Sequence, residues 1–453
     1  METYRTVEKL KDPLILVTEV ENVMNGDICH IRLDHTDVIG QVISADRGNA
    51  LVEVFSSIRG FGKLQTKVSF EGKVFETGVT EHILGRVFNG FGVPIDGSRL
   101  VPEKYVQIYG NPINPAKRDK PRDFIQTGIS SIDGLNSLIK GQKLPLFSGS
   151  GLPSDDMVVQ IVENAKTLKG GRFAVLFGAM GITDRKVDKF LKLMDSPNAD
   201  RTAVFINKAN DSVIERITLP RIVLTHAEYL AFEKGYDVLV VLTDMLSYSD
   251  ALRQLSAERK QIPGRRGYPA SLYTDLASIY ERCGKIKGMQ GSITIMPILT
   301  MPSDDITHPV PDLTGYITEG QIVLGRDLFN RKIYPPVNVQ NSLSRLMDDG
   351  VGKDFTREDH RQVANQLYYA YSKGLDARNL SVLIGSSALS DEDKTYLNFL
   401  EEFEKKFIAQ EPHSDRDIVT TLSIAWELFG GLPELPRINK EFVEKYSVKH
   451  DGI

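Results

Sequence analysis

The stretch Leu144-Pro145-Leu146-Phe147-Ser148-Gly149-Ser150-Gly151-Leu152-Pro153-Ser154-Asp155-Asp156 decides how the middle of this chain is interpreted. A short apolar run leads into a Gly-rich turn, and the turn leads into residues that favour the start of a helix. This order of strand, turn and helix is the layout of a phosphate loop, in which backbone amides and a helix N-terminus cradle phosphate groups. In a working loop, a lysine then reaches the terminal phosphates, and a Ser or Thr hydroxyl binds magnesium.

Gly149, Ser150 and Gly151 preserve the turn, but Leu152 and Pro153 follow it where the lysine and the metal-binding hydroxyl are needed. Pro153 suits the first position of a helix, because its φ is already helical and its missing N–H has no partner there. We therefore expect a stable turn that does not clamp a triphosphate, which is a degenerate, non-functional phosphate loop. The alternative is a strand–turn–helix corner with no nucleotide-binding ancestry.

Two carboxylates, Asp155 and Asp156, lie in the first turn of the expected helix. Negative charge at that position complements the helix dipole, and it repels a triphosphate. The apolar run Val238–Leu242 continues to Asp244, a carboxylate in the place from which phosphate-loop enzymes hold magnesium through water. Many parallel strands end in Asp, so this second pattern discriminates poorly on its own.

Short apolar runs alternate with helix-like segments through the middle of the chain. One such segment, 157–168, keeps its apolar residues at helical spacing. Buried strands that alternate with amphipathic helices predict a parallel sheet covered on both faces, an α/β core of the P-loop NTPase type. The runs are Leu144–Phe147, Phe173–Phe177, Ala203–Ile206, Val238–Leu242 and Ile293–Leu299.

The two ends of the chain have other patterns. Short apolar runs near the N-terminus predict a small antiparallel sheet or barrel, and the Gly- and Pro-rich segment 76–114 is typical of a connection with turns. We predict an N-terminal β-barrel over 1–75, a central α/β domain over 76–350 and a C-terminal helical domain over 351–453. The expected C-terminal helices are Thr356–Lys373, Ser390–Gln410, which begins with a capping box of Ser390 and Asp393, and Asp415–Phe429.

The overall composition argues against several classes of function. Among 453 residues, 55 Lys and Arg stand against 60 Asp and Glu, and the net charge of −5 argues against a nucleic-acid partner. The only cysteines, Cys29 and Cys283, are far apart and indicate a reducing compartment. The histidines lack metal-type spacing, so we expect no metal site. The charged N-terminus has no apolar signal region, and no run approaches about 18 apolar residues, so we expect a soluble, cytoplasmic protein.

Several further runs occur in a fixed order. They are Phe124–Asp133, Gly141–Pro145, Pro263–Pro269, Tyr273–Leu276, Thr300–Pro302, Asp312–Gln321 and Ser342–Leu346. On these runs, and over essentially its whole length, the chain resembles the non-catalytic, regulatory B-type subunits of the V/A-type rotary ATPases and ATP synthases. The Gly-Ser-Gly-Leu-Pro turn separates these non-catalytic subunits from their catalytic sisters.

The resemblance implies an N-terminal β-barrel, a central α/β domain and a C-terminal helical bundle. It implies a ring in which three copies alternate with three catalytic A subunits around central shaft subunits, with peripheral stalk subunits at the N-terminal domain. Such a regulatory subunit is not an enzyme alone. The complex couples ATP hydrolysis or synthesis to proton or sodium transport, and the chain meets the membrane only through it. One departure is Ser154-Asp155-Asp156, where the family often carries His-Asn or His-Lys-Glu, which argues further against nucleotide binding at this loop.

The resemblance also implies which residue still acts in catalysis. In the family the ATP site lies between chains, and the non-catalytic subunit lends it an arginine, which matches Arg345 here. A planar guanidinium can meet the γ-phosphate oxygens as charge shifts in the transition state. ATP or ADP and Mg are then expected at the interface with the catalytic subunit, with no cofactor bound tightly by this chain. The catalytic chain has a water-positioning carboxylate where this chain has Ala179.

Two other functions compete with this interpretation. A self-sufficient hexameric NTPase, such as a secretion motor or a transcription-terminating helicase, shares the α/β core but needs the residues that Leu152 and Pro153 replace. A purely structural spacer would hold the ring without touching nucleotide, and Arg345 would then be an ordinary surface arginine. The pair Arg265-Arg266 resembles a nucleic-acid patch, but the family resemblance implies a solvated or shaft-facing loop.

Overall fold

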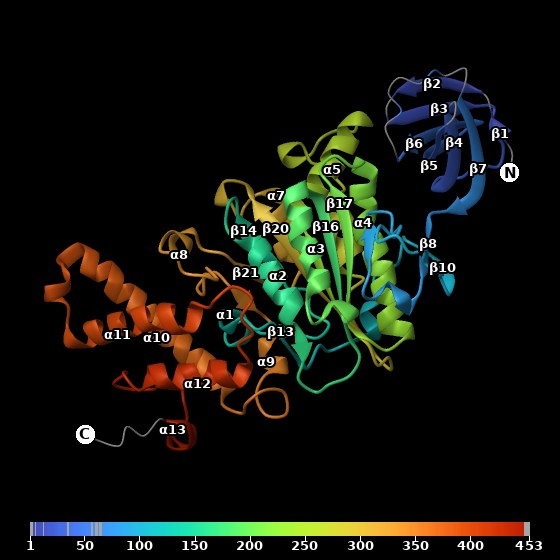
Figure 1. The fold of residues 1–453 in the computed structure, drawn as a ribbon. Helices are drawn as coiled ribbons and strands as arrows, with labels where there is room; N and C mark the ends of the chain where they lie inside the picture. The colour runs from blue at the N-terminus through green and yellow to red at the C-terminus, as the bar shows by residue number, and fades with distance from the viewer. Residues whose placement is uncertain are drawn as a thin grey trace.

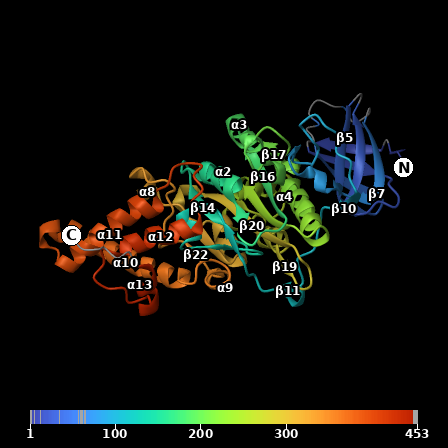
Figure 2. The ribbon, with the colours of Figure 1, turned by 60° about the horizontal axis from the view of Figure 1, so that its bottom comes forward.

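The chain forms three regions that follow one another in sequence and in space (Figure 1). A sheet-rich N-terminal region is followed by a central α/β region and by C-terminal helices, and a second view gives the same order (Figure 2). The predicted fold class is therefore confirmed, whereas the exact domain limits stay predictions. The computed structural model describes residues 3–447 except 5, 12, 34–35, 56–57, 59–61 and 63–65, so the outermost residues of the first and last predicted domains lie outside the described residues.

Seven antiparallel strands build the N-terminal sheet, in the order β1-β7-β4-β5-β6-β3-β2. Alternate residues such as Ile15 and Val17 are buried, the pattern of a sheet with one face on a core. Tyr4 and Val7 are three residues apart but belong to the strands at the two ends of this order, so the edges must meet and the sheet closes as a barrel. The strands are β1 (Thr3–Tyr4), β2 (Val7–Lys11), β3 (Leu14–Thr18), β4 (Asp27–Leu33), β5 (Thr36–Asp46), β6 (Asn49–Val54) and β7 (Thr66–Val74).

The central sheet is mostly parallel and runs in the order β22-β21-β14-β20-β18-β16-β17-β9. Four of the five apolar runs predicted as buried strands lie within its parallel strands, because strands covered on both faces bury both sets of side chains, and the fifth, Leu144–Phe147, overlaps β14 only from Leu146 onward. The edge strand β22 is antiparallel to β21. The strands in this order are β9 (Val87–Asn89), β14 (Leu146–Gly149), β16 (Phe173–Ile182), β17 (Thr202–Lys208), β18 (Asp237–Thr243), β20 (Ser292–Met301), β21 (Gly320–Val323) and β22 (Leu343–Ser344). Two further strands belong to the same sheet outside this order: β19 (Gly284–Ile286) pairs antiparallel with β20 and with β11 (Arg118–Asp119).

Helices cover both faces of this sheet, and a separate apolar core lies under each set. Residues of α2 and α3 pack into one core, and residues of α4, α5, α6 and α7 pack into the other. Figure 1 shows α2 and α3 on the same side of the strands. The helices are α2 (Ser154–Asn164), α3 (Asp184–Leu191), α4 (Val213–Glu228), α5 (Met245–Glu258), α6 (Leu272–Tyr280) and α7 (Pro309–Ile317).

The segment 76–114 is more than the predicted connection. It forms β8 (Glu76–Val79), which pairs with β10 (Lys104–Gln107), and its residues Val87–Asn89 form β9, an edge strand of the central sheet. The physical reason is burial: Phe88 is fully buried and stacks on Phe205 of β17, with ring centroids 4.9 Å apart. The Gly- and Pro-rich composition concealed this short strand.

A buried carboxyl group joins the start of α4 to this segment. Glu215 accepts a hydrogen bond from the Gly90 N–H at 2.7 Å. The approach is so close that a Cβ built at Gly90 would lie 2.6 Å from the Cγ of Glu215, so only glycine fits there. Burial raises the pKa of Glu215 to about 7.

We expect Glu215→Gln to increase stability at alkaline pH and to change little at acidic pH. With a folded-state pKa above its ordinary value, Glu215 contributes stability that is complete below about pH 4.5 and is lost as pH rises through about 7. Gln keeps the acceptor for Gly90 and never ionises, so it should gain on the order of 3 kcal/mol over the wild type by pH 8, at about 1.4 kcal/mol per pKa unit. Calorimetric unfolding of both proteins at pH 5 and pH 8 measures this. An equal difference at the two pH values would contradict it.

The C-terminal region is helical, as predicted, but its helix limits differ. α10 continues to Ile384, past the predicted end at Lys373, and stops at Gly385, whose φ of +84° suits glycine. Half of the predicted capping box is present: Ser390 Oγ accepts the Asp393 N–H at 3.1 Å, whereas the Asp393 carboxylate accepts the Ser390 hydroxyl, at 2.6 Å, in place of its backbone N–H. The elements are α10 (His360–Ile384), α11 (Asp391–Glu402), the π-helical turn η10 (Phe403–Ile408), α12 (Ile418–Phe429) and α13 (Lys440–Tyr446).

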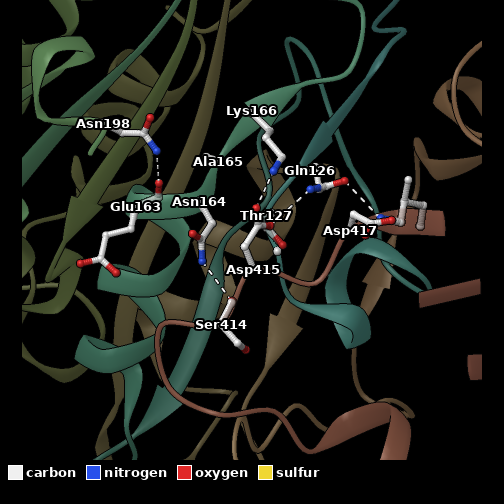
Figure 3. A network of polar contacts seen from close by, with 12 residues as sticks. Gln126, Thr127, Glu163, Asn164, Ala165, Lys166, Asn198, Ser414, Asp415 and Asp417 are labelled. Carbon is white, nitrogen blue, oxygen red and sulfur yellow. Dashed lines mark hydrogen bonds and ion pairs between the residues drawn. The ribbon is translucent and has the colours of Figure 1, made fainter. Parts of the chain in front are cut away.

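A network of polar contacts attaches the segment before α12 to the central region (Figure 3). Lys166 forms an ion pair with Asp415 at 2.5 Å, and Asn164, at the end of α2, donates to the Ser414 carbonyl at 3.0 Å. Gln126 donates to Asp415 at 3.3 Å and accepts the N–H of the first residue of α12 at 3.1 Å. The helical region is thus tied to the sheet region by bonds to both main chain and side chains.

Candidate functional site

Arg345 directly follows β22, the strand at one edge of the central sheet. In the antiparallel pairing of β22 with β21, Ser344 lies opposite Gly320. The pairing extends one residue further, because the Arg345 N–H donates to the Glu319 carbonyl at 3.0 Å. The sheet therefore fixes the backbone of Arg345, although the residue itself is exposed.

Buried polar side chains hold this edge strand in place. Gln142 Nε2 donates to Ser344 Oγ at 2.9 Å, and the Ser344 hydroxyl donates to the Ser137 carbonyl at 2.9 Å. Gln142 and Ser137 are fully buried, so water does not compete for these bonds. Gly320 allows the two strands to approach: a Cβ built there would lie 2.0 Å from the Leu343 carbonyl oxygen.

The side chain of Arg345 has no partner within the described part of the chain, neither a carboxylate nor another hydrogen-bond acceptor. Other arginines of this region are engaged: Arg326 pairs with Asp304 at 2.5 Å, and Arg331 pairs with Glu404. An exposed guanidinium on a fixed backbone is suited to bind an anionic group of another molecule.

The degenerate loop lies at the carboxyl end of β14 and leads into α2. The Leu152 N–H donates to the Gly149 carbonyl at 3.1 Å, and Gly151 has a φ of +81°, so the turn is tight. The Leu152 side chain is only 8% exposed and packs into the core beneath α2. An inward-facing apolar side chain thus stands where a phosphate loop has its lysine.

α2 begins one residue later than predicted. Pro153 has φ −82° and ψ 44°, and with this non-helical ψ it precedes the helix as its cap instead of taking the first position. Asp155 and Asp156 lie in the first turn as expected. They also form ion pairs with two lysines of α3, Lys186 at 2.7 Å and Lys189 at 2.5 Å, which the sequence did not indicate.

Two residues that the sequence did not single out lie directly against this loop. Arg326, the first residue of α8 (Arg326–Asn330), binds both carboxylate oxygens of Asp304, at 2.5 and 2.8 Å. The same guanidinium donates to the Ser150 carbonyl at 2.9 Å. A Cβ built at Gly149 would lie 1.9 Å from Asp304 Oδ1, so the carboxylate covers the main chain of the loop. No spacing rule predicts a pair that is brought together only by the order of the strands.

Asp244 follows β18, as the apolar run predicts, and its carboxylate is occupied within the fold. It accepts the Leu246 N–H at 2.8 Å, which caps α5, and both the N–H and the hydroxyl of Thr300, at 3.2 and 2.5 Å. Burial raises its pKa above the ordinary range of an aspartate. Ala179 lies in β16, fully buried, and offers no acid or base.

The structure does not bring Arg345 to the degenerate loop of its own chain. β14 and β21 are parallel, and their register places Arg345, beside Glu319, level with residue 143, whereas the loop begins at Gly149. Six residues of strand separate the two levels, which is about 20 Å along the sheet at about 3.3 Å per residue. The arginine and the loop therefore belong to two different places on the molecule.

The described part of the chain contains no group of three or more His, Cys, Asp or Glu side chains that could hold a metal ion. Nor does it contain a helix of sufficient length and apolar character to cross a membrane.

Comparison with known proteins assigns both the central and the C-terminal regions. Residues 128–344 match the nucleotide-binding domain of the ATP synthase alpha/beta family, and residues 349–447 match the C-terminal domain of V and A type ATP synthases. Together these matches define a subunit of the V/A type. A solved structure, the ATP synthase subunit NeqB from Nanoarcheaum equitans, is 42% identical, covers 92% of this chain and 98% of its own, and superposes with a TM-score of 0.74. The chain belongs to the ATP synthase alpha/beta family.

Proposed function

We propose that this chain is the non-catalytic, regulatory subunit of a V/A-type ATP synthase or ATPase, and that it lends Arg345 to the ATP site of a neighbouring catalytic subunit. The observation that carries the proposal is the position of Arg345. Its backbone is anchored by the edge of the sheet, its guanidinium is free of partners among the described residues, and it lies about 20 Å from the loop of its own chain. An arginine placed in this way is suited to act on a ligand that another chain holds.

The loop supports the non-catalytic part of the proposal. Leu152 is buried in the core, Pro153 caps α2, and the two carboxylates of the first turn are paired with lysines. Leu152 and Pro153 therefore supply neither the lysine nor the metal-binding hydroxyl that a phosphate loop offers to a triphosphate and its magnesium ion. Ala179 supplies no base to activate water. The residues present do not fit ATP and Mg in this chain, so both belong to the catalytic subunit across the interface.

The same proposal includes the assembly. Copies of this chain alternate with catalytic A subunits in a ring, with central shaft subunits through the ring and peripheral stalk subunits at the N-terminal barrel. The ring couples ATP hydrolysis or synthesis to proton or sodium transport. This chain then lies on the cytoplasmic side and reaches the membrane only through the complex, without nucleic acid as a partner.

ATP turnover of the purified chain, measured alone and after mixing with its catalytic sister subunit, tests this function. We expect no turnover from the chain alone, because its loop lacks the lysine and the metal-binding hydroxyl of a working phosphate loop. The mixture should hydrolyse ATP. The sister subunit alone is the matched control and should be much less active than the mixture. Hydrolysis by this chain alone would reject the proposal in favour of a self-sufficient hexameric NTPase.

A further inference from the structure

The ion pair between Asp304 and Arg326 fills the space in front of the degenerate loop. Asp304 covers Gly149 so closely that a methyl group there would overlap its carboxylate oxygen, at 1.9 Å. Arg326 reaches past the carboxylate to the Ser150 carbonyl, at 2.9 Å. One ion pair thus contacts two consecutive residues of the turn.

The main chain around Asp304 is held in an unfavourable conformation. Ser303 and Asp304 both have a φ of +57°, in the left-handed region that non-glycine residues seldom adopt. The preceding segment is fixed at the end of β20, where the Thr300 hydroxyl donates to Asp244 at 2.5 Å. Two successive left-handed residues turn the Asp304 side chain back over the loop, so this contact is made at a cost in conformational energy.

Asp304 is the acidic group that balances the positive charge of Arg326 beside the loop. The carboxylates of the first turn of α2 are already balanced by Lys186 and Lys189, at 2.7 and 2.5 Å. Asp304 balances Arg326 through two hydrogen bonds, at 2.5 and 2.8 Å. Without Asp304, an arginine fork would face the turn and the N-terminus of α2 with no acidic partner, an arrangement that binds phosphate oxygens.

We propose that Asp304 is the residue that excludes phosphate-bearing ligands from this loop, because its carboxylate takes the place of a phosphate group on Gly149 and on Arg326. The loss of the lysine removed one ligand for phosphate, and Asp304 blocks the site that the turn and Arg326 would still form. This inference concerns the isolated chain and does not rest on the role of Arg345.

Calorimetric titration of the full chain with sodium pyrophosphate tests the inference on the Asp304→Gly variant. Glycine removes the carboxylate and tolerates a φ of +57°, so the variant should fold at least as stably as the wild type. We expect the wild type to show no saturable binding within the titrated concentration range, and Asp304→Gly to saturate with a dissociation constant at least about tenfold below the highest concentration used. Adding Arg326→Gln to that variant should abolish the gain.

Asp305→Asn is the matched control. It removes the same charge one residue away, where the carboxylate pairs with Arg266 at 2.8 Å and does not touch the loop. Like the wild type, Asp305→Asn should show no saturable binding of pyrophosphate. The inference is overturned if Asp304→Gly, with an unchanged circular dichroism spectrum, binds pyrophosphate no more tightly than the wild type. It is also overturned if Asp305→Asn gains as much, or if the gain survives the loss of Arg326.

Discussion

Arg345→Ala should abolish most of the ATP turnover of the assembled complex while the ring still forms. An arginine supplied in trans to a phosphoryl-transfer site commonly contributes about 10³–10⁵ in turnover, because it meets charge that develops only in the transition state. Arg345 has no partner among the described residues, so its removal breaks no ion pair there and leaves the fold of the chain undisturbed. Steady-state turnover of wild-type and variant complexes at saturating ATP measures the loss.

Arg345→Lys is the control that separates charge from geometry. Lysine keeps the positive charge but lacks the planar fork, so we expect it to restore at most a small part of the lost turnover. Size-exclusion chromatography must show that both variant complexes assemble. A variant complex that assembles and turns over ATP at the wild-type rate would mean that the chain is a structural spacer.

Gly320→Ala should lower turnover by about 10², although Arg345 is still present. The new Cβ would lie 2.0 Å from the Leu343 carbonyl oxygen, and alanine is disfavoured at the observed φ of +132°. β22 must therefore move away from β21, and it carries Arg345 with it. A displacement of about 1 Å is enough for a loss of this size when a catalytic group is misplaced. Turnover of the assembled complex, with thermal unfolding of the chain, measures both effects.

Gly315→Ala provides the matched control five residues earlier in the chain. Gly315 lies in α7, and a Cβ there would meet only the end of the Gln321 side chain, at 3.9 Å. Alanine in a helix is favoured over glycine by about 0.5–1 kcal/mol, so this variant should be as active as the wild type and slightly more stable. Equal activity of the two variants would show that the register of β22 does not matter for Arg345.

The central sheet was predictable because its strands are buried on both faces. Runs such as Val238–Leu242 are apolar throughout, a signal that does not depend on the rest of the chain. β9 was not predictable, because three residues in a Gly-rich segment become a strand only through pairing with β17. The length of α10 was underestimated because its last residues, including Val382 and Leu383, are apolar but exposed and therefore break the stripe expected of a packed helix.

In the candidate site, too, some features follow from the local sequence and others depend on contacts between distant segments. The nature of the loop follows from its own residues, because the lysine and hydroxyl are replaced within one short stretch. Arg345 carried no local signal and was identified through the family resemblance alone; its role stays a prediction. The contacts of Asp304 and Arg326 with Gly149 were beyond sequence reasoning, since three strands must come together before these residues meet.

The polar contacts between Asp415 and the central region have a mechanical consequence. Lys166 and Gln126, which lie opposite each other on the paired strands β15 (Lys166–Thr167) and β12 (Phe124–Gln126), both bond the Asp415 carboxylate. Gly128, with a φ of +81°, brings the main chain so near that a Cβ would lie 3.0 Å from Asp415. A rotation of the helical region about this segment would have to break an ion pair and several hydrogen bonds at the same time. We therefore expect the segment before α12 to move together with the central region, and not independently of it, when the helical region is displaced.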